Sequence, residues 1–470
     1  MKLETRNFPP MHDQESPENL PDEPAVGPAA APARDAAAED GESSYAVLRN
    51  PNFSRYLIGR FVAAFGRQML VAAIDWEIYQ RTHSALGLAF VGVSLMIPMI
   101  LLTLPAGHIA DRFNRKTIIL SMTLLLAAAS LGLALVSALS LPVVWIYVLL
   151  VIIGAARTFL WPASAAFVPS LVPRRQFPRA VTFNSGAFQF SCVVGPAACG
   201  LVILLAHQAA WPVYALNVVA SLVYFALVLP IPHRHQAKSD EPFTPRNLIE
   251  GFRFVFHSRI ILGLITLDMF AVLLGGSVAL LPIYAHNIFH AGPAGFGWLR
   301  AAMPVGAVVC MFILAHRPPL QKAGRAMLWS VAVFGAATIL FGLANTNSLG
   351  RWLALPGAFW FWFSFGLLAL AGAVDNVSVI VRQTLVQILT PDEKRGRVSA
   401  VNALFIGTSN ELGGAESGFA AQLFWRPSIL GDAAATGAIM STVIGGFGTI
   451  LVVLAVAWIW PEIRRYGKLG

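Results

Sequence analysis

Residues 85–116 read ALGLAFVGVSLMIPMILLTLPAGHIADRFNRK, an uncharged run that ends at a short and strongly charged turn. A helix rises about 1.5 Å per residue, so the run over 85–106 can cross the roughly 30 Å hydrocarbon core of a bilayer. A membrane strand would need only about ten residues of alternating polarity. In lipid, only helices and closed barrels pair every backbone group. The run therefore predicts a membrane-spanning helix.

Runs of this kind recur along most of the chain. Charged residues make up only 12% of the 470 residues and hydrophobic residues 56%, whereas soluble domains average about 25% charged residues. A water-soluble globule of this size could not hide so much apolar surface. The prediction is an all-α polytopic membrane protein with twelve transmembrane helices. The expected spans are 56–80, 85–106, 117–139, 142–170, 181–206, 210–231, 259–288, 295–315, 325–345, 356–388, 398–424 and 434–460.

The ends and the longest connection divide the chain into parts. Residues 1–44 are rich in Pro, Ala and acidic residues and lack apolar periodicity, so we expect a disordered cytoplasmic tail rather than a signal peptide. A polar connection over 232–258 is expected to be a cytoplasmic linker between a six-helix bundle over 45–231 and a second over 259–460. Residues 461–470 are expected to form a cytoplasmic C-terminus.

The two predicted bundles show signs of a sequence repeat. Two parallel six-helix repeats are one of the layouts that secondary transporters use. At a single offset of 218 residues, Gly154, Pro173, Arg179, Asn184, Gly195 and Gly200 recur as Gly372, Pro391, Arg397, Asn402, Gly413 and Gly418.

Basic residues predict the orientation in the membrane. Lys and Arg gather in the connections after every second span, whereas the opposite loops hold only Arg81, Arg351 and Arg426. By the positive-inside rule both termini are cytoplasmic, in a multi-pass protein of the inner membrane. The net charge of +9 is spread between apolar runs, which favours anionic membrane lipids over nucleic acid as its partner. The cysteines Cys192, Cys199 and Cys310 lie in apolar segments and are expected to be buried rather than paired.

The charged turn carries a recognisable motif. Gly107-His108-Ile109-Ala110-Asp111-Arg112-Phe113-Asn114-Arg115-Lys116 resembles the G-x-L-A-D-R-x-G-R-K loop of the major facilitator superfamily. Asn114 replaces the second glycine, and asparagine tolerates a left-handed backbone. The resemblance implies that Gly107, Asp111, Arg112, Arg115 and Lys116 form a cytoplasmic conformational latch between the two halves. The alternative is an ordinary positive-inside anchor.

Shorter motifs narrow the resemblance, which covers residues 50–460. They look like those of the branch that contains the enterobactin exporter and macrolide efflux proteins, and this resemblance implies export. The motifs are Gly59-Arg60-Phe61, Thr82-His83-Ser84, Gly251-Phe252-Arg253-Phe254, Thr390-Pro391-Asp392 and Gly396-Arg397-Val398.

Charged residues inside the spans are the candidate site. Each costs at least about 2.5–3.5 kcal/mol to insert, so such residues are functional candidates. In the family the first, fourth, seventh and tenth helices line a central cavity, and these helices hold most of the charges. The mid-span candidates for proton coupling or the cavity are Arg67, Arg157, Asp268, Asp375 and Glu411.

The alternatives for these charges stay open at this point. Burial disfavours the charged form of a carboxyl group and a nearby arginine favours it, so each acid could carry a proton. Equally, a permanent pair such as Arg157 with Asp375 could hold the halves together. Asp75, Glu77 and Arg300 lie near the outer face and could reach the interface. Arg60 and Arg382 could anchor lipid headgroups.

The missing motifs exclude several classes of protein. The chain has no G-x-x-x-x-G-K-[ST], H-E-x-x-H or G-x-S-x-G sequence, so we expect no nucleotide-driven pump, no enzyme, no catalytic residues, no cofactor and no metal. The prediction is a secondary active transporter that exports a small molecule by alternating access, as a monomer and a proton antiporter. Arg67 and Arg157 suit an anionic, siderophore-like cargo, and the aromatic spans suit an amphipathic drug. The alternatives are lipid or lysolipid transport, or a non-transporting receptor or scaffold.

Overall fold

The computed structural model describes residues 45–232, 253–318, 321–346, 348–353 and 355–467. The predicted tail and most of the predicted linker lie outside these ranges. The described residues are almost entirely helical, and their only ladder-type contact is an isolated bridge between Ser428 and Gly431.

Six long helices form the first half of the described chain. Each begins or ends within a few residues of an expected span. They are α2 (Pro51–Thr82), α3 (Ala85–Arg112), α4 (Arg115–Ala138), α5 (Val144–Leu171), α6 (Phe177–Leu205) and α7 (Trp211–Val228).

The second half repeats this arrangement with one difference. The span expected at 259–288 is not one continuous α-helix, because it breaks at Gly275 and Gly276. A Cβ on Gly275 would lie 2.4 Å from the Phe334 ring, and one on Gly276 2.5 Å from the Gly413 carbonyl oxygen, so neighbouring helices approach there. The elements are α9 (Arg259–Leu274), η3 (Ser277–Leu280), α10 (Leu281–Ile283), η4 (Tyr284–Ile288), α11 (Gly292–Ala315), α12 (Ala323–Leu343), α13 (Gly350–Leu353), α14 (Gly357–Leu389), α15 (Asp392–Leu423), α16 (Ala433–Ile459) and α17 (Pro461–Arg465).

Eleven helical segments in the described ranges are long and apolar enough to cross a membrane. The twelfth expected span, 398–424, falls on α15. This helix has 32 residues and is long enough to span, but its middle carries Asn410, Glu411, Glu416 and Ser417. Its polar composition therefore sets α15 apart from the other spans.

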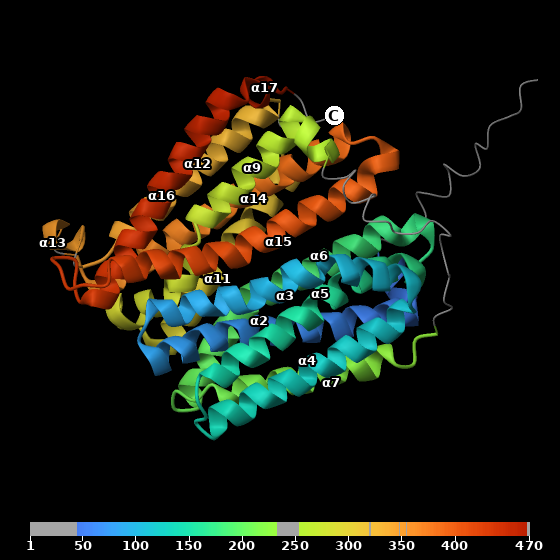
Figure 1. Ribbon diagram of the computed structural model, residues 1–470, viewed down its shortest axis with the longest axis horizontal. Helices are drawn as coiled ribbons and strands as arrows, with labels where there is room; N and C mark the ends of the chain where they lie inside the picture. Colours follow the sequence, from blue (N-terminus) through green and yellow to red (C-terminus); the bar gives the residue numbers. More distant parts are fainter. Residues whose placement is uncertain (1–44, 233–252, 319–320, 347, 354, 468–470) are drawn as a thin grey trace, which may run out of the picture. The chain divides into compact units, whose positions relative to one another are not determined.

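The two halves pack by the same scheme. In the first, α2 packs on α6 and α7, α5 on α3 and α4, and α4 on α7; in the second, α9 packs on α15 and α16, α14 on α11 and α12, and α12 on α16. The blue-to-green and yellow-to-red helices form two groups in Figure 1. The described part of the chain thus forms two helical bundles with equivalent helix neighbours.

The most extensive contacts between the bundles are those of α6 with α11 and of α3 with α15. Glycines allow both approaches. A Cβ on Gly200 would lie 2.3 Å from the Pro293 oxygen, and one on Gly418 would lie 2.7 Å from the Ala85 oxygen. These contacts lie toward the ends of the helices that carry the loops at 83–84, 206–210, 289–291 and 424–432, which we call the closed end. The opposite end, which carries residues 113–114, is the latch end.

Candidate functional site

An ion pair joins the two bundles near the middle of their helices. Arg157 of α5 approaches Glu411 of α15, with 3.6 Å between Nη1 and Oε1. From the helix rise, both lie about 18–20 Å from the closed end. Their side chains remain 37% and 22% exposed, although neither lies near a helix end. The structure therefore brings together two of the five predicted charges, on opposite bundles.

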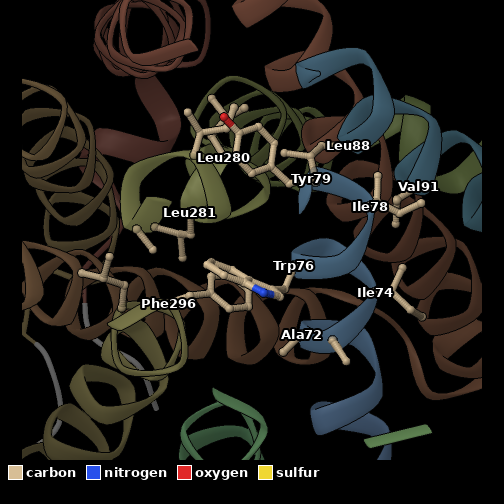
Figure 2. Close-up of a cluster of buried hydrophobic side chains, with 14 of the residues drawn as sticks. Ala72, Ile74, Trp76, Ile78, Tyr79, Leu88, Val91, Leu280, Leu281 and Phe296 are labelled. Atoms are coloured by element: carbon tan, nitrogen blue, oxygen red, sulfur yellow. The ribbon is translucent and has the colours of Figure 1, made fainter. Parts of the chain in front are cut away.

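A second ion pair between the bundles lies closer to the closed end. Arg300 of α11 donates to the carboxylate of Asp75 of α2. Both side chains are largely buried, at 15% and 11% exposed. Beside them, the rings of Trp76 and Phe296 lie 5.5 Å apart, and Figure 2 shows these rings side by side between α2 and the second bundle. Arg300 and Asp75 are thus a buried contact between the bundles rather than groups reaching an interface.

A third layer lies at the closed end itself. The Tyr79 hydroxyl donates to Asn287 Oδ1 at 2.5 Å, and Asn287 Nδ2 donates to Asp432 Oδ2 at 2.8 Å. His83 and His286 lie against the same contact, with ring centroids 5.8 Å apart. Asp75 and Tyr79 lie one turn apart on one face of α2, and His83 caps the end of that helix, so the layers stack along α2. Together they join the bundles from mid-helix to the closed end.

Asp268 is paired inside the second bundle. Arg382 of α14 donates to its carboxylate, and the two side chains are 3% and 9% exposed. The burial of Arg382 excludes a role as a headgroup anchor. Asp375 lies two turns before Arg382 on the same helix and makes no ion pair with the described residues. The alternative pair of Arg157 with Asp375 is not formed, since Arg157 meets Glu411.

Arg67 belongs to a group of arginines on the first bundle. Arg60 lies two helical turns before it on the same face of α2. Arg60 donates to the Tyr56 hydroxyl at 2.9 Å, and Gln68 donates to Cys192 Sγ at 2.6 Å. In the described part of the chain, Arg67 makes no ion pair.

The predicted latch residues lie in the last turns of α3 and the first turn of α4. The side chain of Asp111 is outside the described residues, and Arg112 is exposed. Arg115 donates to the Ala166 carbonyl at 3.0 Å and Lys116 to that of Leu229 at 2.7 Å. Both contacts stay within the first bundle. A Cβ on Gly107 would meet nothing within 4 Å.

Asn114 corrects the expectation of a left-handed turn. Its backbone is extended, with φ −61° and ψ 114°, and its side chain accepts a hydrogen bond from the Lys116 amide. Asparagine is among the best residues for capping a helix N-terminus. The substitution for glycine therefore starts α4 rather than accommodating a positive φ.

Several residues of the closed end were not among the predicted site residues. The sequence does contain a signal for Glu77, because a spacing of four residues favours ion pairs on a helix. In the structure Glu77 pairs with Arg81 at 2.6 Å and accepts a hydrogen bond from the Tyr214 hydroxyl at 2.5 Å. No local pattern in the sequence predicts the pairing of Asp75 with Arg300, since these residues are 225 positions apart. In the described ranges no three His, Cys, Asp or Glu residues are grouped to hold a metal.

Several known proteins are similar to this chain in sequence. Residues 56–415 match the family model described as the Major Facilitator Superfamily. The enterobactin exporter EntS of Citrobacter koseri is 25% identical over 422 residues, 89% of this chain and 94% of that protein. The Escherichia coli exporter of the same name is 24% identical over the same shares.

Solved structures share the fold at low sequence identity. The nucleoside transporter NupG superposes with a TM-score of 0.65 and 13% identity, over 88% of this chain and 99% of that chain. A bacterial homologue of the human lysosomal transporter Spinster, in an inward-facing and unoccupied conformation, has a TM-score of 0.63 and 14% identity, over 88% and 97%.

Proposed function

Because the chain belongs to the Major Facilitator Superfamily, we propose that it exports a small molecule from the cell by alternating access, in exchange for protons. Membership of this family makes it a multi-pass membrane transport protein rather than an enzyme, with a small molecule as substrate. The direction, the coupling ion and the cargo are the parts that we propose.

The observation that carries the proposal is the one-sided contact between the bundles. Both ion pairs between bundles in the described part of the chain, and the Tyr79–Asn287–Asp432 contact, lie from mid-helix to the closed end. Alternating access requires that two repeats seal the path at one end while the other end gives access. Two bundles joined by breakable polar contacts suit this exchange.

The distribution of Lys and Arg supports the direction. It places the latch end in the cytoplasm and the closed end outside the inner membrane. The conformation then loads cargo from the cytoplasm. We propose that Gly107, Asp111, Arg112, Arg115 and Lys116 form the latch in the opposite conformation. The similarity to proteins named as enterobactin exporters supports a siderophore-like cargo, and the aromatic spans support an amphipathic drug.

Glu411 is the best-placed residue for proton coupling. When its carboxylate is charged it attracts Arg157 across the bundles, and when it is protonated this attraction is lost. A proton can therefore weaken a contact that must break during transport. Asp375, which makes no ion pair in the described chain, is a second candidate. Asp268 is less suited, since Arg382 holds it as a permanent partner inside one bundle.

Proton flux in liposomes tests the coupling. Purified protein is assayed with a catechol-bearing siderophore and with a macrolide, and the cargo-dependent proton flux is recorded. Glu411→Gln and Asp375→Asn are expected to reduce the proton flux to that of empty liposomes, because the amide that replaces each carboxyl group does not take up and release a proton. Asp268→Asn tests whether the buried pair also takes part.

The matched control is Glu462→Gln. Glu462 pairs with Arg259 at 3.9 Å, but the two side chains are 43% and 82% exposed. The proton flux of the Glu462→Gln protein should therefore equal that of the parent. If Glu411→Gln, Asp375→Asn and Asp268→Asn all exchange protons as fast as the parent, the coupling assignment is wrong.

A further inference from the structure

Three arginines of the first bundle lie within the membrane-spanning helices α2 and α5. Arg60 and Arg67 are seven residues apart on α2, which places them on one face about 10 Å apart. Arg157 lies on α5, which contacts α2, and its guanidinium approaches Glu411 of the second bundle at 3.6 Å. All three residues are partly exposed.

The acidic residues nearby do not balance this charge. Arg157 has Glu411, but the separation of 3.6 Å is longer than that of a charge-assisted hydrogen bond. Arg60 has the neutral hydroxyl of Tyr56. Arg67 has no carboxylate within ion-pair distance in the described chain. An unpaired cation inside a transmembrane segment is costly, and an anionic ligand would offset that cost.

The second bundle carries acidic residues in two of its membrane-spanning helices. Asp375 of α14 stands at the repeat position of Arg157 of α5, and Glu411 and Glu416 lie on α15. An anion between the bundles is therefore attracted to the first bundle and repelled by the second. The charge distribution gives the bound molecule a definite orientation.

We propose that Arg67, supported by Arg60 and Arg157, binds an anionic group of the cargo, such as a carboxylate or a sulfonate. This inference rests on the proposed transport function and makes the cargo an organic anion whose acidic group faces the first bundle. Neutral or cationic amphipathic drugs then bind only weakly at this site.

Three dansyl compounds that share one ring system test the sign of the charge. Dansylglycine is anionic, dansylamide neutral and dansylcadaverine cationic. Each is titrated by fluorescence against the full chain in nanodiscs, with empty nanodiscs to measure partition into lipid. Dansylglycine is expected to bind at least about tenfold more tightly than dansylamide, the size of one charge-assisted hydrogen bond. Dansylcadaverine should bind most weakly.

Variants identify the residue. Arg67→Gln should abolish the preference for dansylglycine and leave the affinity for dansylamide unchanged, and Arg67→Lys should retain part of the preference. Arg259→Gln removes the same charge from an exposed position and should bind all three probes like the parent. The comparison of probes on the parent needs no variant, so it stands even if Arg67→Gln does not fold.

The outcomes separate this inference from the transport function. Equal affinity of the parent for dansylglycine and dansylamide, or a preference that survives in folded Arg67→Gln, overturns the anion site while leaving transport in place. An Arg67-dependent preference in a protein that moves neither cargo nor protons in liposomes supports the anion site and overturns the transport proposal.

Discussion

Arg382→Leu is expected to destabilise the second bundle by about 3–5 kcal/mol, because it leaves the Asp268 carboxylate buried without its partner. The side chains of the pair are only 3% and 9% exposed, so water cannot replace the guanidinium. The effect should be measured as a loss of unfolding free energy in detergent, with equal protein concentrations and lipid content.

The double variant Arg382→Leu with Asp268→Leu separates the pair from its environment. Replacing both partners of a buried pair by apolar residues is often neutral, so most of the lost stability should return. The control Arg259→Leu breaks an exposed pair and should change stability by less than about 1 kcal/mol. An Arg382→Leu protein that unfolds like the parent would contradict the buried pair.

Leucine at Gly200 or Gly418 is expected to open the closed end. A Cβ at these positions would lie 2.3 Å from the Pro293 oxygen and 2.7 Å from the Ala85 oxygen. Such overpacking costs about 1–3 kcal/mol. It destabilises only the conformation in which these helices touch. Each 1.4 kcal/mol changes the ratio of two conformations about tenfold. The population of the conformation with an open closed end should therefore rise.

The opening can be followed by labelling a buried cysteine. Leu281 lies between α2 and α11 in Figure 2 and is 1% exposed. In a background without the native cysteines, Leu281→Cys should react faster with a polar maleimide when Gly200→Leu or Gly418→Leu is present. Gly366→Leu is the control, because a Cβ there meets nothing within 4 Å. Equal labelling rates in all variants would show that these glycines do not hold the closed end.

Much of the fold follows from local regularities of the sequence. The apolar runs locate the spans to within several residues, and the repeat locates equivalent packing positions. Gly154 packs on Leu95 of α3, and its counterpart Gly372 packs on Met303 of α11; Gly195 packs on α2, and its counterpart Gly413 on α9. Each pair faces an equivalent helix, because duplicated helices with duplicated glycines pack alike.

The partners of the charged residues could not be read in the same way. Depth along a helix correctly marks Arg157 and Glu411 as mid-span, but depth does not say which bundle or which helix face a side chain meets. Depth also leaves open whether Asp75 and Arg300 reach the membrane interface, whereas in the structure they pair across the bundles. Such contacts depend on how the two bundles dock, and no local pattern records this.

We expect the closed end and the latch end of the protein to open alternately. Distances between spin labels measure this motion. One pair of labels, at Ser140 and Arg426, reports on the closed end, and another, at Arg175 and Arg317, reports on the latch end; all four residues are exposed. The distances are compared in acidic and alkaline buffer, and in Gly418→Leu and Glu411→Gln. Whenever the distance between the closed-end labels lengthens, the distance between the latch-end labels should shorten. Distances that stay fixed under every condition, or that lengthen together, would contradict it.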